Sequence, residues 1–244
     1  MLKINLDLYS RKARLYPALL TALPLLLAVL SFSRDLGTIG LPLSVVATCG
    51  FAMLLAQFGR DLGKRKEDSL FRAWGGTPTT QFLRHRSDHL SPVTRRRYHA
   101  ALEALVPNVK LPSREEEAAD PTAADQVYMA CVDWLREATR DRSQFPLVFS
   151  ENVNYGFRRN FWALRRIGIS VSALAFFLSV AAFLLRNATG VPLALPLLSG
   201  STSAAYLGIW LLHVDADWVK LAGFAYARAL LATCDTLSKA TGAK

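Results

Sequence analysis

Four long stretches without an acidic or basic residue constrain the fold of this chain more than any other sequence feature. They are residues 15–32, 39–58, 167–185 and 193–212. About 20 mostly apolar residues are enough for a helix to cross the hydrocarbon core of a bilayer. One such stretch would also suit a buried helix of a soluble protein, but four of them in 244 residues exceed what one soluble core needs. The sequence therefore predicts an all-α membrane protein with four transmembrane helices.

Short linkers join these stretches in pairs. Residues 33–40 (SRDLGTIG) and 186–192 (RNATGVP) contain glycine and other turn-forming residues, which predicts two antiparallel hairpins around a helical insert. After the second hairpin, the spacing of apolar residues predicts an amphipathic helix that lies on the membrane or bundles with its neighbours. The predicted segments are 1–59 (N-terminal flank and first hairpin), 60–166 (cytoplasmic helical insert), 167–214 (second hairpin) and 215–244 (C-terminal amphipathic helix).

Lysine and arginine are distributed unevenly around the predicted spans. Each hairpin tip contains one basic residue, Arg34 or Arg186, whereas the insert contains 19 basic residues and each terminal flank contains four. Segments rich in lysine and arginine stay on the cytoplasmic side of a membrane. Both termini and the insert are therefore predicted to lie in the cytoplasm, and the chain in a bacterial inner membrane as a multi-pass protein. Three scattered cysteines without a metal-binding spacing fit this reduced compartment.

Small and hydroxyl-bearing residues recur on one face of the second and fourth stretches. Residues four apart share a helix face, and small faces let membrane helices approach closely. Packing within one protomer and an interface between subunits both fit this pattern. The hydroxyls either bond to their own helix backbone or line a wet path in an oligomer, and the absence of charge within the spans permits an apolar gate. The predicted pore or packing residues are Ser199, Gly200, Ser203, Ala204 and Gly208.

The insert contains three helix-start signals, each a capping residue followed by proline. They are Thr77-Pro78, Ser91-Pro92 and Asp120-Pro121. Proline suits the first position of a helix, and the residue before it can accept hydrogen bonds from the free backbone N–H groups. The sequence predicts helices over 92–106 and 121–140, a polar linker over 111–121, and a loop or strand over 145–149.

Residues 71–102 form the basic part of the insert, with six arginines and one aspartate, a net charge of +5. Two glycines precede the predicted helix start at Thr77, where free N–H groups attract anions. Arginine forks bind phosphate, and aromatic rings stack on bases. We therefore expect a phosphate-rich ligand, either a nucleotide or short single-stranded DNA; in the alternative, these arginines contact membrane lipid and fix the topology. The predicted ligand-binding residues are Trp74, Gly75, Gly76, Thr77, Thr79, Arg84, His85, Arg86, Arg95 and Arg96.

No catalytic signature accompanies this segment. The chain has no GxSxG, Walker A or GxGxxG motif and no paired carboxylates in an acid–base arrangement. The sequence HRSDH brings His85 and His89 close together, but Arg86 stands where a zinc-binding HExxH helix has its glutamate. The chain is therefore predicted to be neither an enzyme nor a metal protein, and to need no cofactor.

The phrase WGGTPTTQFLRHRSDHLSPVTRRRYH, together with the layout of two hairpins around an insert, resembles the membrane effectors of Hailong-type anti-phage defence. The resemblance implies a homo-oligomeric channel that is controlled by oligonucleotides and works with a nucleotidyltransferase-like enzyme. It assigns no role to any single residue. The alternative prediction is a non-conducting membrane scaffold whose insert recruits a cytoplasmic protein.

Overall fold

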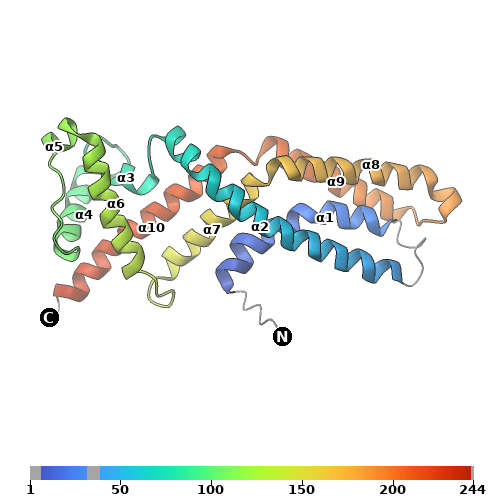
Figure 1. Cartoon of the computed structure of the whole chain (residues 1–244), viewed down its shortest axis with the longest axis horizontal. Coiled ribbons are helices and arrows are strands. Elements are labelled where there is room, and N and C mark those ends of the chain that lie inside the picture. The colour runs from blue at the N-terminus through green and yellow to red at the C-terminus, as the bar shows by residue number, and fades with distance from the viewer. Residues whose placement is uncertain (1–6, 32–38, 243–244) are drawn as a thin grey trace. The chain divides into compact units, whose positions relative to one another are not determined.

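The computed structural model describes residues 7–31 and 39–242, and every regular element within them is helical (Figure 1). Four of its helical stretches are long and apolar enough to cross a membrane: Ser10–Leu30, Gly40–Leu83, Arg165–Ala188 and Ala194–Leu212. Each overlaps one of the four predicted stretches, which confirms the all-α class and the four candidate spans. The elements are the π-helix η1 (Ser10–Leu15), α1 (Tyr16–Leu30), α2 (Gly40–Trp74), α3 (Pro78–Leu83), α4 (Pro92–Leu105), α5 (Arg114–Ala119), α6 (Pro121–Ala138), α7 (Pro146–Ala163), α8 (Arg165–Thr189), α9 (Ala194–Leu212) and α10 (Ala216–Gly242).

The chain forms two compact units. Residues 1–67 and 156–219 make up the first, called the span unit here, and residues 68–155 and 220–244 make up the second, called the insert unit. The three boundaries fall inside α2, α7 and α10 rather than at the predicted 59/60, 166/167 and 214/215. In each case the polar residues next to an apolar stretch, 60–67, 156–166 and 215–219, still belong to the span unit.

The span unit is built around close helix contacts. Helices α8 and α9 pack along each other, and α1 packs against both. Small side chains allow these approaches: Ala18, Ala22 and Ala52 are almost completely buried together with Leu164. A Cβ added to Gly168 would collide with the ring of Trp210, which shows how tightly α8 meets α9. The predicted first hairpin tip, with Arg34, lies outside the described residues.

The insert unit is held by one apolar core and by well-capped helices. Side chains from α3, α4, α6, α7 and α10 form this core, so the described part of the predicted C-terminal helix bundles with its neighbours. The side chains of Thr77, Ser91 and Asp120 each accept a hydrogen bond at the start of a helix, which confirms all three predicted caps.

Two predictions for the insert were wrong. Residues 145–149 are neither a strand nor only a loop, because α7 begins at Pro146. The predicted polar linker contains the helix α5, which begins with a reciprocal pair of hydrogen bonds between Ser113 and Glu116. Each side chain accepts from the other residue's backbone N–H, and this local exchange stabilises a helix of only six residues.

Candidate functional site

The predicted ligand-binding segment begins with a turn that suits glycine. Helix α2 ends at Trp74, and Gly75 and Gly76 follow with φ angles of 84° and 125°. Residues other than glycine rarely adopt φ angles in this range. The Oγ1 atom of Thr77 then accepts a hydrogen bond from the backbone N–H of Thr80 at 3.4 Å. The helix start that was predicted to attract anions therefore already contains an acceptor of its own.

Arg84 uses three of its donors within the protein. Its Nε and Nη2 atoms donate to the two carboxylate oxygens of Asp125 at 2.8 and 2.6 Å. Its Nη1 atom donates to the backbone oxygen of Gly75 at 2.6 Å. Hydrogen bonding to Asp125 raises the pKa of Arg84, since the bonds stabilise its charged form. Arg84 therefore ties the glycine turn to α6.

Glu117 on α5 is a central residue of this region that the sequence analysis missed. It is buried, and its Oε2 atom accepts hydrogen bonds from the backbone N–H of His85 and from the hydroxyl of Tyr128, each at 2.8 Å. Its Oε1 atom accepts from the backbone N–H of Arg86 at 3.4 Å. Burial acts to raise the pKa of Glu117, but these hydrogen bonds outweigh burial and the pKa is lowered overall. The capping box that begins at Ser113 was the available sequence signal for a helix here.

Arg95 holds the loop after α3 from within. It lies on α4 and is 9% exposed, and its Nη1 atom donates to the backbone oxygens of Arg84 and Ser87 at 3.2 and 2.7 Å. Both bonds come from this one nitrogen, and together they fasten the loop to α4. Arg84 and Arg95 together therefore shape the segment that was predicted to bind ligand.

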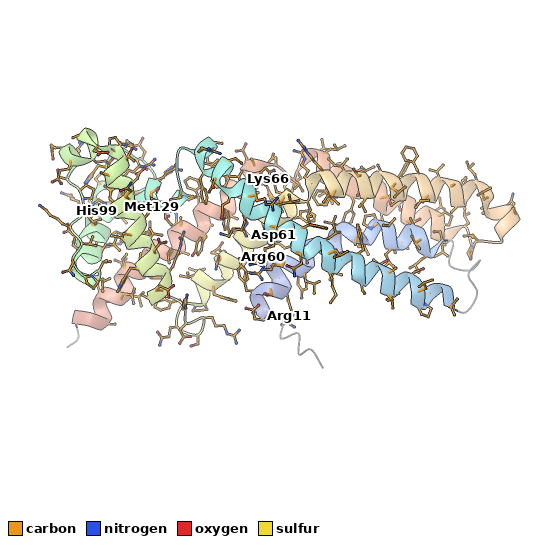
Figure 2. All side chains as sticks on the ribbon, viewed as in Figure 1. Arg11, Arg60, Asp61, Lys66, His99 and Met129 are labelled. Atoms are coloured by element: carbon orange, nitrogen blue, oxygen red, sulfur yellow. The ribbon has the colours of Figure 1, made fainter. Side chains whose placement is uncertain are left out.

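Two histidine rings pack at the centre of the same region. His99, labelled in Figure 2, has its Nε2 atom 2.8 Å from the backbone oxygen of Leu83. The ring of His85 meets it edge-on, with centroids 5.0 Å apart, and its own Nε2 atom lies 3.0 Å from the backbone oxygen of Pro112. Burial lowers the pKa of His99 and so favours its neutral form. Within 7–31 and 39–242, no three His, Cys, Asp or Glu side chains are grouped to hold a metal ion.

The predicted ligand-binding residues therefore divide into a buried group and an exposed group. Trp74 is 9% exposed and Thr79 is 4% exposed, so neither presents its side chain to solvent. Arg86 and Arg96 are exposed, and Arg86 approaches the carboxylate of Glu117 only to 3.9 Å. Of the predicted arginines, these two are the ones available to a soluble ligand.

A cluster of rings and cations on α10 also adjoins this segment. The ring of Phe224 lies 4.9 Å from that of His89, and the Nζ atom of Lys220 lies 5.6 Å from the centre of the Phe224 ring. The guanidinium of Arg228 lies 5.5 Å from the centre of the Phe82 ring. The sequence analysis did not include this cluster, although the spacing of residues 220, 224 and 228 places them on one helix face.

The charge of the two units differs from what the basic segment alone indicated. The insert unit has 15 basic and 13 acidic residues, a net charge of +2. The span unit has 14 basic and 6 acidic residues, a net charge of +8. Asp125 of α6, Glu117 of α5 and Asp235 of α10 each form an ion pair with an arginine of residues 71–102. The larger excess of positive charge belongs to the span unit.

The predicted pore residues of α9 also divide into two groups. Ser199 and Ser203 are buried, and the Oγ atom of Ser199 lies 2.8 Å from that of Ser179 on α8. A Cβ on Gly200 would lie 3.5 Å from the Cβ of Ser179, so this position also faces α8. Ala204 is exposed, and nothing lies within 4 Å of a Cβ on Gly208.

In α2, the corresponding small residues pack within the span unit. Ser44 is 5% exposed and Ala52 is fully buried. The hydroxyls of Ser44 and Thr48 donate to backbone oxygens four residues earlier, at 2.7 and 2.8 Å. For the small residues of α2, these contacts support packing within one protomer.

Comparisons of the chain with protein families, with curated proteins and with solved structures find no match.

Proposed function

We propose that this protein is a homo-oligomeric, ligand-gated ion channel that acts as a membrane effector in bacterial anti-phage defence. In this proposal the four spans form two antiparallel hairpins in the inner membrane. Both termini and the insert unit lie in the cytoplasm, and the insert unit responds to a nucleotide or short single-stranded DNA made by a nucleotidyltransferase-like partner. The membrane-spanning part of the proposal rests on four apolar helices of sufficient length.

The observation that carries the gating proposal is that continuous helices connect the span unit to the insert unit. Each boundary falls within an unbroken helix, in α2, α7 or α10. A helix is a stiff element, so a ligand that changes the insert unit has a direct route to the spans. The ligand shifts the channel equilibrium only by its difference in affinity for the two states.

The exposed basic residues are the proposed ligand contacts. Arg86 and Arg96 are exposed, and Arg86 lies no closer than 3.9 Å to the carboxylate of Glu117, so both guanidinium groups can donate to the phosphate oxygens of a ligand. His89 presents an exposed ring supported by Phe224, which suits stacking of a base. Arg84 and Arg95 act in this scheme as supports of the loop and not as ligand contacts.

The exposed face of α9 is the proposed contact between subunits. Ala204 and Gly208 are small, lie four residues apart and therefore share a helix face, which allows a second helix to approach closely. No acidic or basic side chain occurs in the four apolar stretches, so the closed path is proposed to exclude ions by dewetting.

The test is ion flux from liposomes that contain the purified full chain, with and without short DNA oligomers. We expect oligomer to change the flux, and we expect the double substitution of Arg86 and Arg96 with alanine to weaken that response at least about tenfold, since each charged hydrogen bond contributes about 1.5 kcal/mol or more. Arg136→Ala is the matched control, because Arg136 is an exposed arginine of α6 paired with a neighbour one turn away. Unchanged oligomer response in the double variant would refute the assigned contacts.

The second candidate is a non-conducting scaffold, and one observation favours it. Three of the arginines in the basic segment, Arg84, Arg95 and Arg97, are hydrogen-bonded within the protein, and the insert unit has a net charge of only +2. Such a surface is less suited to nucleic acid than the sequence indicated and more suited to a protein. Sealed liposomes under both conditions, with insertion verified, would support the scaffold and contradict the channel.

A further inference from the structure

Three aromatic rings pack against one another where the segment after α3 contacts α10. The centroid of the His89 ring lies 4.9 Å from that of Phe224 and 5.4 Å from that of Phe82, and the two phenylalanine centroids are 5.8 Å apart. Phe82 is 2% exposed and Phe224 is half-buried, whereas His89 is exposed. These three residues, called the ring cluster here, therefore hold one imidazole at the surface on a packed aromatic support.

Two cations of α10 lie over rings of this cluster. The Nζ atom of Lys220 is 5.6 Å from the centre of the Phe224 ring, and the guanidinium of Arg228 is 5.5 Å from the centre of the Phe82 ring. The face of a ring attracts a cation, but the N–H groups that point away from the ring stay free to donate. Neither cation makes a hydrogen bond or an ion pair with any residue that the structure describes. Both are therefore positioned by the rings and able to donate to an external anion.

The spacing of the two cations limits what one ligand group can contact. Lys220 and Arg228 share a face of α10 with Phe224 midway between them, and they lie about 12 Å apart along the helix axis. Each charged group lies over its own ring, and a hydrogen bond reaches only about 3 Å. A single phosphate is too small to contact both cations. A ligand that uses both therefore carries two separate anionic groups, with room for a planar group at the exposed ring of His89.

We propose that the ring cluster, with Lys220 and Arg228, binds a nucleoside that has a phosphate on each side of it. The base stacks on His89, Lys220 donates to one phosphate, and the guanidinium fork of Arg228 donates to the other. This inference rests on the proposed function, which gives the insert unit a nucleotide or short single-stranded DNA as its ligand. It narrows that ligand to a strand, because a nucleoside within a strand has both a 5′ and a 3′ phosphate.

Geometry rather than total charge selects the ligand in this site. The insert unit has a net charge of only +2, so its overall field favours a more highly charged anion weakly. A nucleoside triphosphate carries all of its phosphates on one side of the sugar and reaches one of the two cations. A nucleoside 3′,5′-bisphosphate reaches both cations. It should bind about tenfold more tightly than the monophosphate or the triphosphate, because it gains one more hydrogen bond between charged groups.

The experiment is calorimetric titration of the full chain, in phosphatidylcholine nanodiscs, with thymidine 3′,5′-bisphosphate, thymidine 5′-monophosphate and thymidine 5′-triphosphate. Lys220→Gln and Arg228→Gln, each made singly, should lower the affinity for the bisphosphate about tenfold, to the level of the monophosphate. The matched control carries Arg140→Gln and Arg142→Gln, which removes two exposed cations from the same unit. It should keep the affinity within about twofold, because salt screens charges that lie outside the site.

Two results would overturn the inference. Binding of the triphosphate as tightly as the bisphosphate would mean that total charge and not spacing selects the ligand. A loss in the control equal to that of Lys220→Gln would mean that the unit attracts anions without a specific site. Lys220→Gln keeps the test valid if Arg228→Gln misfolds, because Lys220 lies over a half-buried ring and not over the buried Phe82.

Failure of this inference is distinct from failure of the proposed function. Liposome flux that responds to DNA oligomers equally in the unchanged protein and in Lys220→Gln would leave the channel in place and remove this site. Flux that ignores oligomers, while the bisphosphate binds with the expected preference, would remove the channel and leave the site.

Discussion

The Nη1 atom of Arg159 lies 2.7 Å from the Oε1 atom of Glu67, and the two side chains are only 7% and 12% exposed. The pair joins α7 to α2 within the span unit, across 92 positions of sequence. Arg159 also donates to the Oδ1 atom of Asn160 at 3.3 Å, and the Nδ2 atom of Asn160 donates to the backbone oxygen of Ala13 at 2.7 Å. One buried polar network therefore connects η1, α2 and α7.

Removing the negative charge from this network should destabilise the span unit strongly. Glu67→Gln removes the carboxylate charge that lies 2.7 Å from the buried guanidinium of Arg159, which costs about 3 kcal/mol in the free energy of unfolding. The measurement is SDS-induced unfolding of the protein in mixed micelles. Lys64→Gln is the control: Lys64 also pairs with Glu67, but its side chain is 66% exposed, and its loss should cost less than about 1 kcal/mol. Equal effects of the two substitutions would contradict a buried network.

Two glycines of α2 should respond oppositely to alanine. A Cβ on Gly63 would lie 2.6 Å from the Oδ1 atom of Asn160, whereas a Cβ on Gly50 would have nothing within 4 Å. Gly50→Ala should stabilise the helix by about 0.5 to 1 kcal/mol, because alanine loses less backbone freedom on folding. Gly63→Ala gains the same propensity but displaces Asn160, so we expect net destabilisation. Thermal unfolding of both variants in one detergent checks the difference, and stabilisation by Gly63→Ala would show that α2 and α7 are not in close contact.

His99 should make the insert unit less stable as the pH falls below neutral. Burial lowers the pKa of His99 below its ordinary value of 6.5, so the unfolded chain takes up the proton first. The contribution of His99 to the stability of the insert unit is fully present above pH 6.5, and it is lost as the pH falls toward the pKa of His99 in the folded protein. The measurement compares the pH dependence of unfolding, between pH 7.5 and about pH 5, with that of His99→Gln.

Three neighbouring charged or titratable groups affect the pKa of His99. His85 and Arg95 disfavour its protonation, while Glu103 favours it. His99→Gln keeps a donor for the backbone oxygen of Leu83 but cannot take up a proton, so its stability should change less over the same pH range. Parallel curves for the two proteins would rule out His99 as the source of the dependence.

Cysteine labelling should locate the two sides of the membrane. In a Cys49→Ser background, Asn187→Cys should react with an impermeant maleimide in intact cells, and Lys239→Cys only after the inner membrane is opened. The native Cys131 and Cys234 should stay unlabelled in the folded protein, because both are buried and burial raises their pKa to about 11 and about 12. Labelling at both introduced positions in intact cells would refute the proposed orientation of the C-terminus.

The features that could be predicted from the sequence depend on residues close together in the chain. A span requires about 20 consecutive residues without charge, because a helix satisfies all of its own backbone groups in lipid. The caps at Thr77, Ser91 and Asp120 act on N–H groups two or three residues away. Such local chemistry is already complete in the amino-acid sequence, and the sequence therefore determined the helical class, the four candidate spans and the starts of α3, α4 and α6.

The use of the charged side chains was decided only by tertiary structure. Arg84 meets Asp125 across 41 positions, and Glu117 meets His85 across 32, so no local pattern reveals either pair. A run of arginines in the sequence therefore indicated a ligand site, while the folded protein uses Arg84 and Arg95 internally and leaves Arg86 exposed. Electrostatic energy depends on distance in space, and folding brings together charges that the chain keeps far apart.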